Sequence, residues 1–279
     1  MKTVSASPAE PVPASALASP RNVLVWDVPV RVFHWLMVLS FAGAYLTAES
    51  ERWRLAHVTL GYTMGGLVAF RLVWGLIGSR HARFASFIKG PAAIVRYVRS
   101  VLGERPEHHL GHNPAGALAI VLMLALAAAV TASGWALYND LSGEWLEELH
   151  EVAANLMLSV IGVHVAAVLI SSRLHRENLV AAMIDGRKAG SPKDGVRSAW
   201  RSVGVLMLVA VLGFWFKWVM REAGVASADA LGRDRTLYCL RHTSIMFRLL
   251  YGQGIDMLTL ARNARTSVQM IERFYASAL

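Results

Sequence analysis

The chain has 279 residues, of which 55% are hydrophobic, and its mean hydropathy of +0.41 is too high for an ordinary soluble domain of this length. The formal net charge of +9 suggests nucleic-acid binding, but the basic residues lie mostly in loops between apolar runs, which argues against that partner. The single cysteine, Cys239, excludes an intramolecular disulfide, a thiolate-bound iron–sulfur cluster and the covalent attachment of a c-type haem.

Residues 1–22 are rich in proline, alanine and serine and lack a basic stretch followed by an apolar one. We therefore expect this segment to be disordered and not to be a signal peptide. Beyond it, five apolar runs are each long enough to cross a bilayer as one helix, near residues 30–48, 55–77, 115–138, 152–172 and 202–220. The sequence therefore predicts an all-α integral membrane protein with five spans.

The first two runs each contain a histidine. His34 lies one turn inside the first run, and His57 lies at the start of the second. Arg71 follows His57 by fourteen residues, which is close to four helical turns, so both side chains share one face. Gly61 and Gly65 follow at four-residue spacing, where the missing side chains allow close approach of either a helix or a flat ring. The sequence leaves these two roles open.

The polar segments between the runs differ in charge, and this difference predicts the orientation of the chain. Six basic residues lie between the second and third runs and seven follow the fourth. The connection between the third and fourth runs instead carries Asp140, Glu144, Glu147 and Glu148 and no Lys or Arg. Basic loops stay on the cytoplasmic side of a membrane. We therefore expect the N-terminus to be cytoplasmic.

The fourth run carries His150 and His164, fourteen residues apart, so their imidazoles leave one face of the helix. They are about 21 Å apart along its axis. A polar group in hydrocarbon costs several kcal/mol unless a partner takes it, so we interpret both as ligands. The predicted orientation brings His34 and His164 to the cytoplasmic surface and His57 and His150 to the opposite surface. We therefore predict two ligand pairs at matched depths.

Paired histidines on different helices, with no cysteine beside them, favour haem over zinc, because zinc requires four converging ligands. A haem with histidine on both faces has no open axial site and therefore transfers electrons. Arg71 lies at the depth of the inner pair, where its guanidinium suits a haem propionate. The competing interpretation is a transporter with a histidine relay for protons or a metal. That interpretation requires carboxylates inside the spans, and only Glu151 lies between the histidines.

Six spaced motifs carry a resemblance to a known family: FHW at 33–35, AHVTLGY at 56–62, FRLVWGLIGSRHARF at 70–84, GHNP at 111–114, LHEVAANLMLSVIGVH at 149–164 and RENLV at 176–180. They resemble the bacterial cytochrome b561 family, in particular the branch of the b-type cytochrome subunit of nickel–iron hydrogenases. The resemblance covers roughly residues 22–190.

The resemblance implies a four-helix di-haem bundle in which His34, His57, His150 and His164 bind two haem b groups. It also implies a respiratory function in the inner membrane, with electrons passing between the quinone pool and a partner redox protein such as a cytochrome c or a hydrogenase-like subunit. Five further histidines lie in polar segments or at helix ends. We expect them to be exposed to solvent, with a quinone site as the alternative: His81, His108, His109, His112 and His175.

The sequence changes character at about residue 236. The stretches LYCLRHTSIMFRLL and IDMLTLARNARTSVQMIERFY resemble the end of a tyrosine recombinase catalytic domain, with Arg241 at the second active-site arginine and Tyr275 at the nucleophile. Tyr238 and Thr266 depart from the usual histidine positions, and the first arginine and the lysine have no counterpart. Recombination requires those cations around its transition state, so we expect no activity and no nucleic-acid partner.

These patterns divide the chain into four expected parts. A disordered segment, residues 1–22, precedes a cytochrome b561-like di-haem domain at 23–190. A linker with the fifth transmembrane helix occupies 191–235, and an inactive recombinase-like fragment of short helices occupies 236–279.

Overall fold

The computed structural model describes residues 21–103, 107, 109–141, 143–225, 228, 232–252 and 254–275, and these residues are mostly helical. The longer helices are α1 (Val28–Leu46), α2 (Arg54–Ile77), α4 (Pro91–Leu102), α5 (Pro114–Tyr138), α6 (Glu144–Leu174), α8 (Arg201–Glu222) and α9 (Leu237–Tyr251). The short elements are β1 (Arg21–Leu24), η2 (Glu51–Trp53), α3 (Phe84–Phe87), α7 (Leu179–Asp185), β2 (Arg187–Gly190), η3 (Pro192–Asp194), α10 (Met257–Asn263) and α11 (Val268–Phe274).

Five helical segments of the described chain are long and apolar enough to cross a membrane: Val28–Leu46, Glu51–Ile77, Pro114–Tyr138, Glu144–Leu174 and Arg201–Glu222. They coincide with the five predicted runs, so the prediction of an all-α membrane protein is confirmed. The described residues form two compact units. The first takes the residues up to 46 together with 60–204, and the second takes 47–59 together with the residues from 205 onward.

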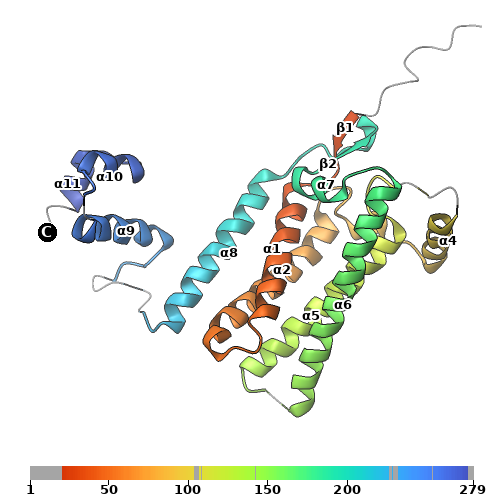
Figure 1. Ribbon diagram of the computed structural model, residues 1–279, viewed down its shortest axis with the longest axis horizontal. Coiled ribbons are helices and arrows are strands. Elements are labelled where there is room, and N and C mark those ends of the chain that lie inside the picture. The colour runs from red at the N-terminus through yellow and green to blue at the C-terminus, as the bar shows by residue number, and fades with distance from the viewer. Residues whose placement is uncertain are drawn as a thin grey trace, which may run out of the picture. The chain divides into compact units, whose positions relative to one another are not determined.

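The core of the first unit is a four-helix bundle of α1, α2, α5 and α6, which run side by side in Figure 1. One apolar cluster draws on all four helices, with Phe41 from α1, Met64 from α2, Ala127 from α5 and Met157 from α6. Their side chains are at most 7% exposed, so the cluster packs at the density of a protein interior. It lies within the spans and keeps the four helices in contact.

Local signals in the sequence explain where α5 begins. Asn113 precedes the helix and its side chain accepts a hydrogen bond from the Gly116 amide at 2.7 Å, while Pro114 occupies the first helical position. An asparagine cap satisfies one of the amides that a helix start leaves without a partner, and proline there removes another. The predicted start of the third span is therefore confirmed.

A two-stranded antiparallel sheet joins the start of the first unit to its end, beside α7 (Figure 1). β1 pairs with β2, so Arg21 and Asn22, which we expected to be disordered, form a strand; residues 1–20 lie outside the described residues. Gly186 ends α7 with φ of +82°, and its carbonyl oxygen accepts the amides of Val25 and Trp26. The pairing supplies the hydrogen bonds that residues 21–24 cannot make alone.

The C-terminal helices of the second unit have a small core of their own. Ile245 from α9, Leu260 and Ala261 from α10, and Ile271 from α11 pack together with Tyr275. The α10 and α11 starts are capped by Asp256 and Ser267 respectively, each accepting a backbone amide. The described part of this segment thus forms one helix of 15 residues and two of 7.

Candidate functional site

Asp27 fixes the start of α1, the helix that carries His34. Its carboxylate is fully buried, and Oδ1 accepts the Val30 amide at 2.8 Å while Oδ2 accepts the indole N–H of Trp74 at 3.0 Å. The first bond caps α1, and the second ties that helix start to α2. His34 follows two turns later, so Asp27 determines the position at which this histidine enters the bundle.

His34 lies on α1 and His164 on α6, two helices of the same bundle, and their pairing stays a prediction. The Nδ1 atom of His34 is buried and has no hydrogen-bond partner among the described residues. The next residue, Trp35, donates its indole N–H to the Met183 carbonyl at 3.2 Å, which anchors this turn of α1. A buried polar atom without a protein partner is expected where a ligand binds.

Arg71 lies on α2 and is only 3% exposed. Its guanidinium lies 4.8 Å from the ring centre of Phe84 and 6.0 Å from that of Phe87, and Asp27 interacts with its charge. Its Nη1 atom is buried and has no hydrogen-bond partner among the described residues. The guanidinium therefore has donor capacity for an anionic group.

The structure corrects the expectation that the loop histidines are exposed: His81, His109, His112 and His175 are all half-buried, and His108 lies outside the described residues. The polar loops fold back against β2 and η3, where the ring of His81 is 2.8 Å from the Asp194 carbonyl. His112 packs against Trp26 and Phe87, with ring centres 4.4 and 4.6 Å apart. Trp26 and Phe87 are far from His112 in sequence, so the residues next to His112 gave no indication that its ring is packed.

Burial lowers the pKa of His112 to about 3, and the positive charges of Arg71 and Lys188 act in the same direction. Its imidazole is therefore neutral at physiological pH. Its Nδ1 atom is buried and lacks a hydrogen-bond partner among the described residues. His112 thus joins Arg71 and Lys188 in one electrostatic cluster that sequence reasoning did not identify.

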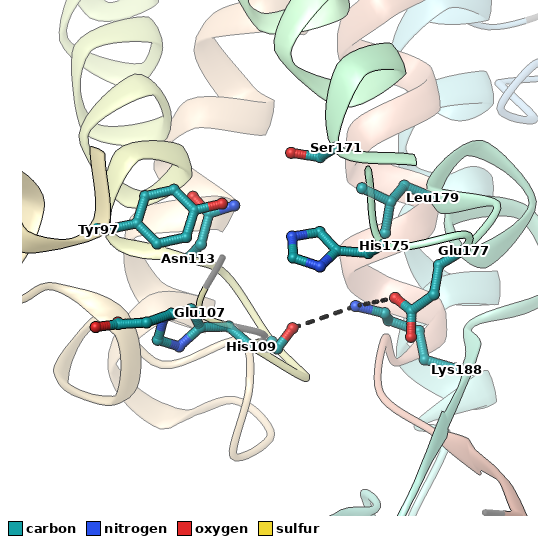
Figure 2. Close-up of a pocket in the computed structure, with 10 residues that line it drawn as sticks. Tyr97, Glu107, His109, Asn113, Ser171, His175, Glu177, Leu179 and Lys188 are labelled. Atoms are coloured by element: carbon teal, nitrogen blue, oxygen red, sulfur yellow. Dashed lines mark hydrogen bonds and ion pairs between the residues drawn. The ribbon is translucent and has the colours of Figure 1, made fainter. Parts of the chain in front are cut away.

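A polar pocket lies on the side of the bundle that carries the basic loops, and Figure 2 shows its lining. Lys188 of β2 is bound there to Glu177 at 3.0 Å and donates to the His109 carbonyl at 3.3 Å. The two side chains of this ion pair are only 6% and 19% exposed. The contact fastens β2 to the residues that follow α6 and to the segment before α5.

His150 and His164 lie on one continuous helix, α6, as the spacing predicted. The imidazole of His150 contacts α5, where its Nδ1 is 3.0 Å from the Ser133 hydroxyl and Gly134 leaves room for the ring. His57 lies in the first turn of α2 but belongs to the second unit, so its pairing with His150 stays a prediction.

These residues fit a haem held by two histidines. His34 Nδ1 and Arg71 Nη1 are buried atoms without a hydrogen-bond partner in the described part of the chain, and such atoms are where a bound group is expected. A Cβ atom added at Gly61 would meet nothing within 4 Å, so the face of α2 is open there. Imidazole nitrogens are the donors that haem iron takes in b-type cytochromes, and a guanidinium suits the propionates.

Comparisons with known proteins point in the same direction. Residues 25–186 match the model of the family described as prokaryotic cytochrome b561. The probable Ni/Fe-hydrogenase B-type cytochrome subunit of Rhodobacter capsulatus is 24% identical over 215 residues, which are 60% of this chain and 81% of that protein. The protein of the same description in Azotobacter vinelandii is 25% identical, over 59% of this chain and 87% of its own.

A probable Ni/Fe-hydrogenase 1 B-type cytochrome subunit of Escherichia coli K12 is 26% identical over 142 residues, which are 42% of this chain and 60% of that protein. No solved structure gives a significant match. The family match ends before the C-terminal segment and gives no support to its resemblance to a tyrosine recombinase, which stays a prediction. Because the match covers more than half of the chain and contains four of the five apolar helices, this protein belongs to the prokaryotic cytochrome b561 family, as a multi-pass bacterial membrane cytochrome of the b type that holds haem b and takes part in electron transfer.

Proposed function

We propose that this protein is a di-haem cytochrome that transfers electrons between the quinone pool and a partner redox protein in bacterial respiration. The hydrogenase subunits among its relatives favour a hydrogenase-like partner over a cytochrome c. The distribution of basic loops supports an inner-membrane location with the N-terminus in the cytoplasm.

The observation that carries this proposal is the inner histidine pair. His34 and His164 come from α1 and α6, two helices that share one packed core. We assign them as the two axial ligands of one haem. We assign Arg71 as the propionate-binding residue, because the buried Nη1 atom of its guanidinium has no hydrogen-bond partner among the described residues. Gly61 provides clearance on α2.

We assign His57 and His150 as the axial ligands of the second haem. The support is the continuous helix α6, which carries His150 and His164 on one face about 21 Å apart. A haem with two histidine ligands exchanges single electrons without binding oxygen. Two such centres at different depths carry electrons across much of the membrane. No observation favours the competing transporter with a histidine relay.

Haem content tests the ligand assignment. Purified protein should hold two low-spin b haems per chain, measured from the dithionite-reduced minus oxidised spectrum and from extracted haem. Variants His34→Ala and His150→Ala should each lose one haem, and a different one. His109→Ala is the matched control and should keep both, because its imidazole faces Glu107 at 3.5 Å outside the apolar spans. Folded protein without haem, or full haem in both ligand variants, would overturn the assignment.

Quinone linkage is tested with the same protein. Adding a short-chain quinol should reduce the haems without dithionite, and the control Gly213→Ala, at a position where a Cβ atom meets nothing within 4 Å, should behave as the wild type. Co-purification of a hydrogenase-like subunit from native membranes would support the partner. Haems that are reduced by dithionite but not by any menaquinol or ubiquinol analogue would contradict the quinone linkage and leave the haem assignment intact.

A further inference from the structure

The Ser133 hydroxyl of α5 has three neighbours at hydrogen-bond distance, although it has only one proton to donate. It lies 2.8 Å from the Ala129 carbonyl and 3.1 Å from the Val130 carbonyl of its own helix, and 3.0 Å from Nδ1 of His150. Ser133 is 3% exposed, so water does not replace these contacts. Serine in an apolar helix commonly donates its proton to the carbonyl four residues earlier.

The distances favour one direction for the bond to His150. The shortest contact of the Ser133 hydroxyl is the one to the Ala129 carbonyl, which only accepts, so we assign the Ser133 proton to α5 and the hydroxyl oxygen as the acceptor of the imidazole N–H. Nδ1 of His150 therefore carries its proton, and the lone pair of the neutral ring is on Nε2. This is the tautomer that a metal-binding imidazole needs.

Gly134 makes this contact possible. A Cβ atom at position 134 would lie 2.9 Å from Cε1 and 3.3 Å from Nδ1 of His150, closer than side chains pack. Any residue other than glycine would push the ring away from α5 and from the Ser133 hydroxyl. The two neighbouring residues thus supply the space and the acceptor for one histidine.

We propose that Ser133 is a positioning residue for His150, which holds the imidazole in the Nδ1-protonated tautomer and raises its strength as an axial ligand. The proposal rests on the proposed function, in which His150 binds a haem.

The effect has a direction. An acceptor on the Nδ1 proton increases the electron density of the ring and favours ferric over ferrous iron. Removing the acceptor with Ser133→Ala should weaken the binding of ferric haem relative to ferrous haem by about tenfold. This is within the range measured for residues that hydrogen-bond to a metal ligand. For a one-electron couple, tenfold corresponds to an upward shift of about 59 mV in midpoint potential. Only the haem that His150→Ala removes should shift.

The experiment is a potentiometric titration of the haem spectrum, with low-spin EPR, in the purified full-length protein. Ser133→Ala should shift one of two redox waves upward and move the g values of the same haem. Ser133→Thr retains the hydroxyl, so the midpoint potential and the g values of this haem should stay at their wild-type values. Thr131→Val is the matched control, because Thr131 makes the same bonds to the carbonyls three and four residues earlier, at 3.2 and 2.8 Å, on the same helix.

Gly134→Ala gives an independent test, since alanine is the better helix former and a loss is not explained by weaker helix propensity. This variant should shift the midpoint potential of the same haem or abolish the binding of that haem. Gly213→Ala, where a Cβ atom meets nothing within 4 Å, should change neither the potentials nor the haem content. If His150→Ala loses a haem while Ser133→Ala moves neither potential nor g values, the positioning role is wrong and the ligand assignment stands. If His150→Ala keeps both haems, the ligand assignment itself fails.

Discussion

Replacing Asp27 should destabilise the first unit, because this carboxylate is 0% exposed and two buried donors depend on it. In Asp27→Asn the capping oxygen for Val30 remains, but an NH₂ group meets the indole N–H of Trp74. A buried donor without an acceptor costs about 1–3 kcal/mol. Asp27→Ala also removes the cap, worth about 1 kcal/mol, so the expected loss is about 2–4 kcal/mol.

The assay is urea or thermal unfolding of the detergent-solubilised protein, followed by circular dichroism and by the haem spectrum. Asp194→Asn is the control, because Asp194 is a half-exposed carboxylate bound to Arg80 at 3.4 Å. Exposed ion pairs contribute about 0–1 kcal/mol, so this variant should unfold with the wild type. If Asp27→Ala and Asp194→Asn lost the same small amount, the role assigned to Asp27 at the start of α1 would be refuted.

Three further predictions concern other parts of the chain. The folded pKa of His112 is about 3 against an ordinary 6.5, so the unfolded chain binds a proton that the folded chain does not, and stability should fall as pH drops from about 6.5 toward 3. The slope reaches about 1.4 kcal/mol per pH unit, and His112→Gln should flatten it in unfolding curves measured across this range. Glu177→Ala leaves Lys188 buried without its counter-charge and should cost about 3–5 kcal/mol in chemical unfolding, with Glu177→Ala/Lys188→Met recovering most of it. Ile271→Ala should cost about 2–5 kcal/mol of local packing, seen as faster proteolysis of the C-terminal helices with an unchanged haem spectrum; equal proteolysis rates would contradict the small core described for them.

The helices of this protein were predictable from sequence because a helix is a local structure. Its hydrogen bonds join residues four apart, so length, periodicity and end signals are visible in one window of sequence. The apolar run near residues 115–138 gave the extent of α5, and the fourteen-residue spacing placed His150 and His164 on one face of α6. The alternation of basic and acidic loops gave an orientation without any knowledge of packing.

The surroundings of the histidines required the tertiary structure, because they come from residues far apart in the chain. Asp27 meets Trp74 across 47 residues, and β1 meets β2 across more than 160. The contact of Ser133 with His150 joins two helices whose sequences carry no mark of each other. Such contacts depend on which helix faces pack together and on how closely, which small residues such as Gly134 decide. The sequence by itself therefore determined the spans and the histidines within them, and packing alone decided which of those histidines receives a hydrogen bond.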